Sequence, residues 1–502
     1  MFSVILSDLT SRSISFLIDK CSRPTASPTP EEMLNRLQRL VARVHIIVEE
    51  AEERRIANPA MLRQLSTLRK EMYRGYHTLD ALRCRAHGDR AKDHQVSPPT
   101  TPSVFRLRPA KKRVRFGSSC SSTGHEQQKL TEAISSLEIT IADASELVVL
   151  LAGCPRLCRQ PYTMYLLLEK CMFGRQMEVE RIMDFLLQAE GLGAESPSVL
   201  PIIGPRRVGK STVIEHACND ERVRRSFSKI MCFSDNGMKS GNKKVTTLSD
   251  CDVIKHHNRA IEEERVLVII ELTGAIDEDV WRKLYADCKH HVAGGSKIIV
   301  ASRSDDIAAF GTTQALRMQF ITQEAYWYFF KVRTFGSTDI EDHPKLASIA
   351  MDVALELSGC FLGANTFSSL LKENFDARFW SMALERIKDF KRMNYLVDGA
   401  RFIDRQIVKR AFVRKVNNRT TSEYFVIRDD YQTCCFQMPP QTETPMMSIK
   451  TLLFGPIRPH RRFKVLAWRS HIPPHYSYML DCELWRPQRM ASRKNRIEEI
   501  SS

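Results

Sequence analysis

A phosphate-binding pattern, Gly-x-x-x-x-Gly-Lys-Ser, lies in the stretch PIIGPRRVGKSTV. Glycines let backbone N–H groups approach phosphate oxygens without a clashing Cβ atom. A lysine at this position reaches the β- and γ-phosphates, and the serine hydroxyl is a ligand for Mg²⁺. A helix expected to begin at Lys210 would turn its positive end toward the anion. The pattern predicts a nucleotide site that contains Gly204, Pro205, Arg206, Arg207, Val208, Gly209, Lys210, Ser211 and Thr212.

Two later residues could complete this chemistry. Glu271 closes the apolar run VLVIIEL, where a P-loop NTPase needs an acid to hold Mg²⁺ and poise water. The next residue is Leu272, so a second acid is missing there. Arg303 follows the run KIIVAS, at the sheet edge where ligands bind, and could sense the γ-phosphate or form a surface ion pair. The acids at 277–279 are interpreted as a helix cap.

The elements that position these residues follow from alternating patterns. The short apolar runs SVLPII, KIMCFS, VLVIIEL and KIIVAS alternate with helical stretches, which predicts a parallel sheet covered on both faces. Because proline cannot donate to a ladder, Pro201 is expected among the first residues of its strand. Residues 321–395 have a helical pattern. Beyond residue 400 the pattern is mixed and then strand-like, as in SEYFVIRD, TLLFG and KVLAW.

The N-terminal part of the chain is predicted to be helical. Apolar residues recur at helical spacing after Glu31, and a second amphipathic segment begins at Pro59. The first stripe comprises Leu34, Leu37, Leu40, Val41, Val44 and Val48. These two helices could pack on each other as a simple hairpin or on a partner chain. Further helices are expected at about 126–152 and 176–190.

Composition limits the function classes only loosely. The 502 residues carry a net charge of +16, which fits nucleic acid, an anionic surface or simple solubility. Residues 97–124 hold six Lys or Arg and no acid, which predicts a solvated linker, with a nuclear address as the alternative. No recognition motif for nucleic acid accompanies this charge.

The fourteen cysteines have no repeated metal-ligand spacing, and Cys154 and Cys158 lack a second pair, so reduced thiols are expected. The N-terminus lacks a basic region before its apolar residues and is a poor signal peptide. No window offers an uninterrupted apolar span, so no membrane helix is predicted. These observations predict a cytoplasmic protein, with the nucleus as an alternative.

Several ordered segments together resemble the NB-ARC domain of plant intracellular immune receptors of the CC-type NLR family. The resemblance covers roughly residues 31–395 and is carried by LRKEMYRGYHTLDAL, FGRQMEVERIMDFL, GPRRVGKST, FSKIMCFS, GSKIIVASRS, EAYWYFFKVRTFG and LSGCFLGAN. It implies that Gly174 and Arg175 lie by the adenine and that Arg303 senses the phosphate. Phe361 stands where the family has a proline that contacts the base.

The departures from the family pattern affect the expected activity. The paired family aspartates are Glu271 and Leu272 here, and no Met-His-Asp segment or leucine-rich-repeat array follows residue 395. Binding of ADP or ATP with Mg²⁺, held by Ser211 and Glu271, is therefore expected more firmly than hydrolysis, which would be slow at most. The divergent grass-type members of the family are the nearest match that the resemblance suggests.

The resulting fold class is multidomain, with helical and α/β parts. The predicted segments are a tail (1–30), an Rx-type coiled-coil helical domain (31–96), a basic linker (97–124), a helical connector (125–170), a P-loop nucleotide-binding domain (171–320), a helical ARC-like subdomain (321–395) and a β-rich region of unknown role (396–502).

Three functions compete. The first is a nucleotide-dependent switch in plant immunity that controls signalling by the N-terminal helices, with other receptor chains or self-association through residues 31–96. The second is a scaffold that has lost nucleotide chemistry but still pairs with complete receptors. The third, least favoured, is a nucleic-acid-stimulated ATPase, which predicts turnover that rises with nucleic acid and falls with salt.

Overall fold

The computed structural model describes residues 29–54, 56, 58–93, 120–156, 173–188, 196–234, 252–254, 265–272, 274–292, 295–398, 411–417, 422–434, 446–455, 462–469 and 476–485. The chain forms two compact units. The first comprises Met1–Leu79 and Pro99–Arg156, and the second comprises Asp80–Pro98 and Leu157–Ser502.

The first unit is helical. It contains α2 (Pro30–Glu52), the first part of α3 (Pro59–Asp93), α4 (Cys120–Asp143) and α5 (Ser145–Ala152). Thr29 and Glu32 form a capping box that fixes where α2 begins. The predicted stripe on α2 is buried from Leu37 to Val48, while Leu34 is half-buried.

Helix α4 packs along α2, so the region predicted as a connector contributes to the helical core. Arg36 of α2 forms an ion pair with Glu138 of α4, and Leu137 is fully buried. Helix α4 begins at Cys120, which makes the end of the predicted linker 97–124 helical. The rest of that linker lies outside the described residues. The helices are confirmed, whereas their coiled-coil arrangement stays a prediction.

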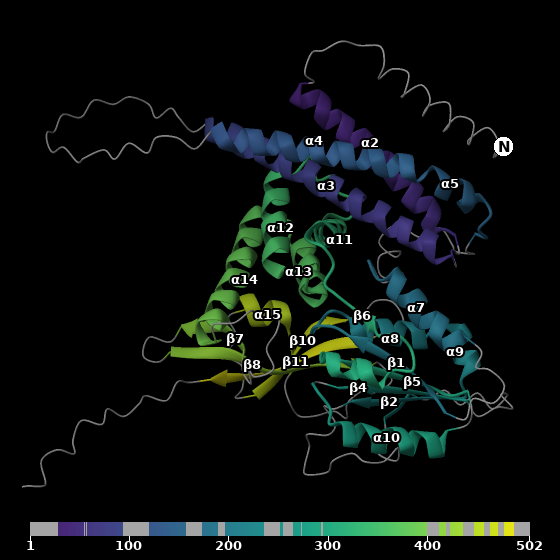
Figure 1. Ribbon diagram of the computed structural model, residues 1–502. Helices are drawn as coiled ribbons and strands as arrows, with labels where there is room; N and C mark the ends of the chain where they lie inside the picture. Colours follow the sequence, from purple (N-terminus) through teal and green to yellow (C-terminus); the bar gives the residue numbers. More distant parts are fainter. Residues whose placement is uncertain are drawn as a thin grey trace, which may run out of the picture. The chain divides into compact units, whose positions relative to one another are not determined.

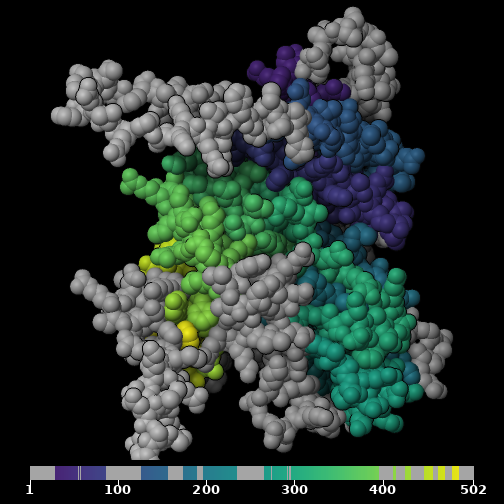
Figure 2. All heavy atoms as spheres, turned by 60° about the vertical axis from the view of Figure 1, so that its left-hand side comes forward, coloured from purple at the N-terminus to yellow at the C-terminus, as the bar shows by residue number. Residues whose placement is uncertain are grey.

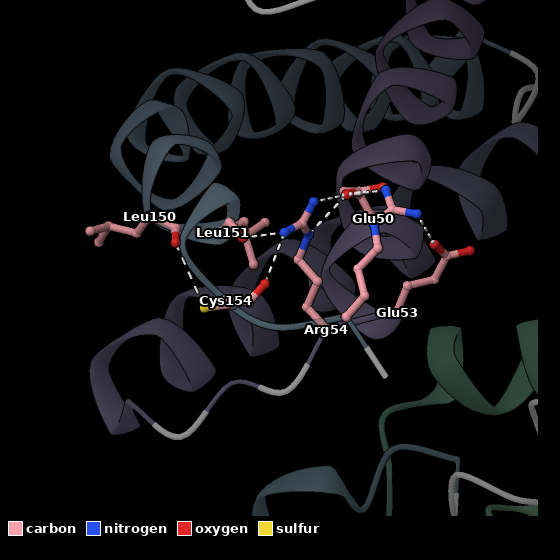
Figure 3. A network of polar contacts seen from close by, with 7 residues as sticks. Glu50, Glu53, Arg54, Leu150, Leu151 and Cys154 are labelled. Atoms are coloured by element: carbon pink, nitrogen blue, oxygen red, sulfur yellow. Dashed lines mark hydrogen bonds and ion pairs between the residues drawn. The ribbon is translucent and has the colours of Figure 1, made fainter. Parts of the chain in front are cut away.

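A buried arginine joins the end of α2 to the end of α5 (Figure 3). Arg54 donates to the carbonyl oxygens of Leu151 at 2.7 Å and Cys154 at 3.0 Å. Its Nε also donates to Glu50 at 2.9 Å. The arginine thereby supplies a donor to the Cys154 carbonyl and a second donor to the Leu151 carbonyl, which also accepts from the Cys154 N–H at 3.0 Å.

The second unit contains a six-stranded sheet of order β3-β2-β4-β5-β1-β6. Its strands are β1 (Ser198–Ile203), β2 (Lys229–Ser234), β3 (Asp252–Ile254), β4 (Val266–Glu271), β5 (Lys297–Ser302) and β6 (Leu316–Arg317). All neighbours pair in parallel except β3, which is antiparallel to β2. The predicted parallel sheet is confirmed.

Helices cover both faces of this sheet (Figure 1). One face packs on α7 (Gln176–Leu187), α8 (Lys210–Cys218) and α9 (Glu221–Ser226). The other face packs on α10 (Glu278–His291) and a 3₁₀ helix (Asp305–Phe310). Successive strand residues alternate between these two cores, which is why the strands are almost continuously apolar.

Pro201 is the fourth residue of β1, not one of the first, so the expectation for its place was wrong. The strand tolerates Pro201 because the proline nitrogen faces a side of β1 where the ladder does not need an N–H donor at this position. The Val199 N–H, two residues earlier and on the same side, donates to the Thr312 side chain at 2.7 Å and not to a strand. The short β6 pairs only with Ile202 and Ile203.

A helical layer follows the sheet, as predicted for residues 321–395. It contains α11 (Gln323–Phe335), α12 (Pro344–Leu357), α13 (Phe361–Glu373) and α14 (Ala377–Asp398). The helices share a core that buries Trp327 and Trp380. In Figure 2 the green residues of these helices form one contiguous mass on the visible face.

The C-terminal part forms a second, mixed sheet of order β7-β8-β11-β10-β9. Its strands are β7 (Ala411–Asn417), β8 (Ser422–Cys434), β9 (Met446–Ser448), β10 (Arg462–Arg469) and β11 (Tyr476–Trp485). The stretch TLLFG was predicted as a strand, which is wrong for its first four residues: they belong to helix α15 (Ile449–Phe454). Ser448 caps that helix by accepting from the Thr451 N–H, and Leu452 and Leu453 enter the core of the sheet.

Three further expectations concern membranes, metals and thiols. Among the described residues, no helix has the length and apolar character needed to cross a membrane. The same part of the chain contains no cluster of three potential metal-ligating side chains. Cys154 is a free thiol, and Cys158 lies outside the described residues.

Candidate functional site

The predicted phosphate loop joins β1 to α8. Gly209 is the N-cap of α8 with φ +98°, a backbone conformation that strains other residues, and the helix begins at Lys210 as expected. Gly204 passes so close to the next segment that an added Cβ atom would lie 2.6 Å from the Met318 carbonyl oxygen. Both glycines therefore have a steric reason to be there, and the loop has the strand–turn–helix context that phosphate binding requires.

Lys210 lies over this loop. Its Nζ donates to the carbonyl oxygens of Gly204 at 2.6 Å and Pro205 at 3.0 Å. Burial lowers the pKa of Lys210 to about 8, a shift that the positive charge of Arg303 increases and the negative charge of Glu271 opposes. These effects show that the structure brings Lys210, Glu271 and Arg303 together.

Ser211 and Glu271 form a pair of oxygen donors. The Ser211 side chain hydrogen-bonds the Glu271 carboxylate, and burial raises the pKa of Glu271 despite that bond and the Lys210 charge. Glu271 ends β4, while the following Leu272 packs against the core. Oxygen ligands of this kind fit Mg²⁺, which binds through few protein groups and keeps several waters. Thr212 follows in the first turn of α8.

The carboxyl ends of the central strands supply the other side of the site. Arg303 directly follows β5, and its charge acts on Lys210. Asp277 caps α10 by accepting from the Asp279 N–H at 2.9 Å, which confirms the interpretation of these acids as a helix cap. Contact between Arg303 and a γ-phosphate stays a prediction.

Arg175 contacts the phosphate loop through its own hydrogen bonds. Its guanidinium donates to the carbonyl oxygens of Val208 at 3.1 Å and Gln319 at 2.6 Å, and to Glu178 at 2.8 Å. Arg175 is buried, and its neighbour Gly174 has φ +69°. Val208 is itself buried in the core beneath the loop. This arginine braces the loop, while its predicted role beside a nucleotide base is untested.

A row of aromatic side chains leads from this entry segment to α13. Phe173 lies 5.1 Å from Phe329 between ring centroids, and Phe329 meets Phe361 edge to face at 5.2 Å. Phe361 begins α13, next to Cys360, whose carbonyl oxygen accepts from the Tyr326 hydroxyl at 2.8 Å. The two segments that the family resemblance assigned to the base thus share one aromatic row. Base contact by Phe361 stays a prediction.

One residue of the site was missed by the sequence reasoning. Asp430, in β8 of the C-terminal sheet, forms ion pairs with Arg206 and with Arg207, the latter at 2.9 Å. These partners lie more than 220 residues apart in the chain. The stretch SEYFVIRD was predicted to be strand-like, but it ends at Asp429, and nothing in the local pattern indicated a partner for Asp430.

The comparisons with known proteins agree with the expected resemblance. Residues 175–339 match the family model of the NB-ARC domain. The putative disease resistance protein RGA1 of Solanum bulbocastanum is 23% identical over 375 residues, which cover 72% of this chain and 35% of that protein. The disease resistance protein RGA2 of the same plant is 27% identical over 237 residues, which cover 44% of this chain and 24% of that protein. The putative disease resistance RPP13-like protein 1 of Arabidopsis thaliana is 23% identical over 386 residues, which cover 70% of this chain and 34% of that protein.

The chain therefore spans about a third or less of the length of these relatives. Among solved structures, C. elegans PCH-2 has a TM-score of 0.29 and 12% identity, with 42% of this chain and 68% of that chain covered. Drosophila ORC bound to DNA has a TM-score of 0.28 and 12% identity, with 49% of this chain and 73% of that chain covered. At these scores the likeness carries no conclusion about function.

Proposed function

We propose that this chain, whose residues 175–339 match the family model of the NB-ARC domain, binds ADP or ATP as a molecular switch in plant immunity. The observation that carries the proposal is the meeting of Lys210, Ser211, Glu271 and Arg303 around the N-terminus of α8. The disease resistance relatives supply the immune context. A cytoplasmic location belongs to the same proposal.

Each residue of the site has a physical role in this proposal. The N–H groups at the start of α8 and the Lys210 ammonium bind the phosphates. Mg²⁺ would be held by the Ser211 hydroxyl and, through water, by Glu271, and would neutralise phosphate charge when bound. Arg303 lies within electrostatic reach of Lys210 and would distinguish nucleotides by their terminal phosphate.

The site is better suited to sensing a nucleotide than to rapid turnover. Glu271 is a single acid, already hydrogen-bonded to Ser211, and Leu272 next to it turns into the core. A second acid that could orient an attacking water is therefore missing at this position. We expect hydrolysis that is slow at most, with bound ADP or ATP setting the state of the protein.

A switch also needs an output, and the helices of residues 31–96 are the proposed one. Nucleotide exchange would change the availability of these helices for other immune-receptor chains or for self-association. Such an effect requires different affinities for the two nucleotide states. Contacts to the terminal phosphate, from Lys210 and Arg303, could supply that difference.

The test is to extract and identify nucleotide from the purified protein. We expect about one ADP or ATP per chain from the wild type and little from Lys210→Ala, because the lysine supplies the central phosphate contact. Lys283→Ala is the matched control, since Lys283 is exposed on α10 of the same domain and should retain nucleotide. A folded wild-type protein that neither carries nucleotide nor binds added ADP would refute the switch and favour the scaffold.

A further inference from the structure

Asp430 of the C-terminal sheet reaches the middle of the phosphate loop. Its Oδ2 accepts from the Arg207 guanidinium at 2.9 Å, and its Oδ1 accepts from Arg206. The Asp430 side chain is 8% exposed, whereas those of Arg206 and Arg207 are 44% and 31% exposed. A carboxylate this buried is costly unless it is paired, so the two arginines hold it in place.

The second of these two loop arginines, Arg207, has an unusual backbone conformation and a donor that is unpaired among the described residues. Arg207 has φ +62°, in the left-handed region that residues with a Cβ atom seldom adopt. Its Nε is buried and has no acceptor among the residues that the structure describes. Strain and an unused buried donor at one residue are typical of functional sites, where a ligand can supply the missing partner.

The surroundings of Asp430 keep the carboxylate as the main anion at this point. Tyr478 of β11 lies beside it, and burial together with the Asp430 charge raises the pKa of that phenol to about 12. Tyr478 is therefore neutral near pH 7. The Cys360 thiol at the start of α13 also lies within electrostatic reach of Arg207.

We propose that Asp430 is an internal anionic ligand of the phosphate loop, which competes with the phosphates of a bound nucleotide for Arg206 and Arg207. A carboxylate and a phosphate offer the same kind of oxygen acceptor to a guanidinium. Full engagement of both arginines by phosphate requires Asp430 to release them. The C-terminal sheet thereby sets the nucleotide affinity of a loop more than 220 residues away. This inference rests on the proposed nucleotide site.

The experiment uses the full chain and a fluorescent ADP with Mg²⁺. Asp430→Asn keeps the side-chain shape and removes the charge, so we expect the Kd for ADP to fall about tenfold. Asp429→Asn is the matched control, because Asp429 is the neighbouring acid in β8 and is exposed, whereas the ion pairs with Arg206 and Arg207 are made by Asp430. Its Kd should equal that of the wild type.

The outcomes separate this inference from the proposed function. An Asp430→Asn affinity that equals or falls below that of the wild type overturns the competition, while the nucleotide site stands. Failure of both proteins to bind ADP overturns both. If Asp430→Asn binds ADP and the wild type does not, the result supports both the nucleotide site and the competition, since the Asp430 carboxylate then blocks the wild-type loop.

A second measurement covers the case in which Asp430→Asn does not fold. Hydrogen exchange of wild-type β8 is compared with and without ADP. Release of Asp430 predicts faster exchange around residues 424–430 in the presence of ADP, because the strand loses its contact with the loop. Unchanged or slower exchange there would overturn the proposal.

Discussion

At the scale of single residues, Lys210 gives the site a pH dependence. Burial holds its pKa at about 8 in the free protein, and a bound phosphate raises it because the anion favours the charged form. Binding therefore takes up a proton only above that pKa. We expect the affinity for ADP to be constant below about pH 8 and to fall by up to about tenfold per pH unit above it.

The measurement is the Kd of a fluorescent ADP between about pH 7 and about pH 9.5 at constant ionic strength. Lys210→Arg is the control, since a guanidinium stays protonated throughout this range. Its affinity, whatever its size, should not depend on pH there. A flat wild-type profile would mean that Lys210 does not carry the phosphate contact.

Single residues also show how far sequence reasoning reaches. Glu271 and Arg303 could be placed at the site because each ends or follows an apolar strand, and parallel strands end at a common edge. Asp430 could not be placed in this way. Its contact depends on how a second sheet packs against the loop, and no local pattern encodes such a long-range pairing.

At the scale of elements, Arg54 makes a prediction about the helical unit. The side chain is 6% exposed and donates to two carbonyl oxygens at the end of α5 (Figure 3). Arg54→Ala removes these donors, although the Leu151 carbonyl keeps the Cys154 N–H at 3.0 Å, and losing hydrogen bonds from a buried charged group costs about 2 kcal/mol. We expect amide exchange in residues 145–152 to accelerate about 30-fold, measured on the full chain by mass spectrometry.

Arg156→Ala is the matched control for that variant. Arg156 donates to the same Glu50 at 2.9 Å but is 54% exposed, and an exposed ion pair contributes about 0.5 kcal/mol. Exchange in α5 should therefore change little. Equal effects of the two variants would show that Arg54 stabilises the unit only by charge and not by satisfying the helix end.

Elements differ in how well their patterns predicted them. The strands β1, β2 and β5 were predicted with their bounds and β4 to within one residue, because buried parallel strands are apolar throughout and are flanked by turns. The run TLLF was taken for a strand because a short apolar run has no period of its own. Its helix is set by the Ser448 cap and by packing of two leucines into the sheet.

At the scale of the whole molecule, nucleotide binding should stabilise the second unit selectively unless the two units are coupled. All five tryptophans lie in the second unit, namely Trp281, Trp327, Trp380, Trp468 and Trp485. Their fluorescence therefore follows the unfolding of that unit alone. ADP at about 100 times its Kd stabilises the bound unit by about 2.7 kcal/mol, and we expect a rise of about 2–4 °C in the tryptophan-monitored Tm.

A switch requires the helical unit to respond as well, and hydrogen exchange in α2 and α4 reports on it separately. A coupling free energy of about 1 kcal/mol between site and helices would change exchange there about fivefold when ADP replaces ATP. Lys210→Ala should abolish both the Tm shift and the exchange difference, because each depends on phosphate binding. A ligand shifts an equilibrium only between states for which its affinities differ. A Tm shift with unchanged exchange in α2 and α4 would therefore mean that the protein binds nucleotide but that binding is not coupled to the proposed signalling helices.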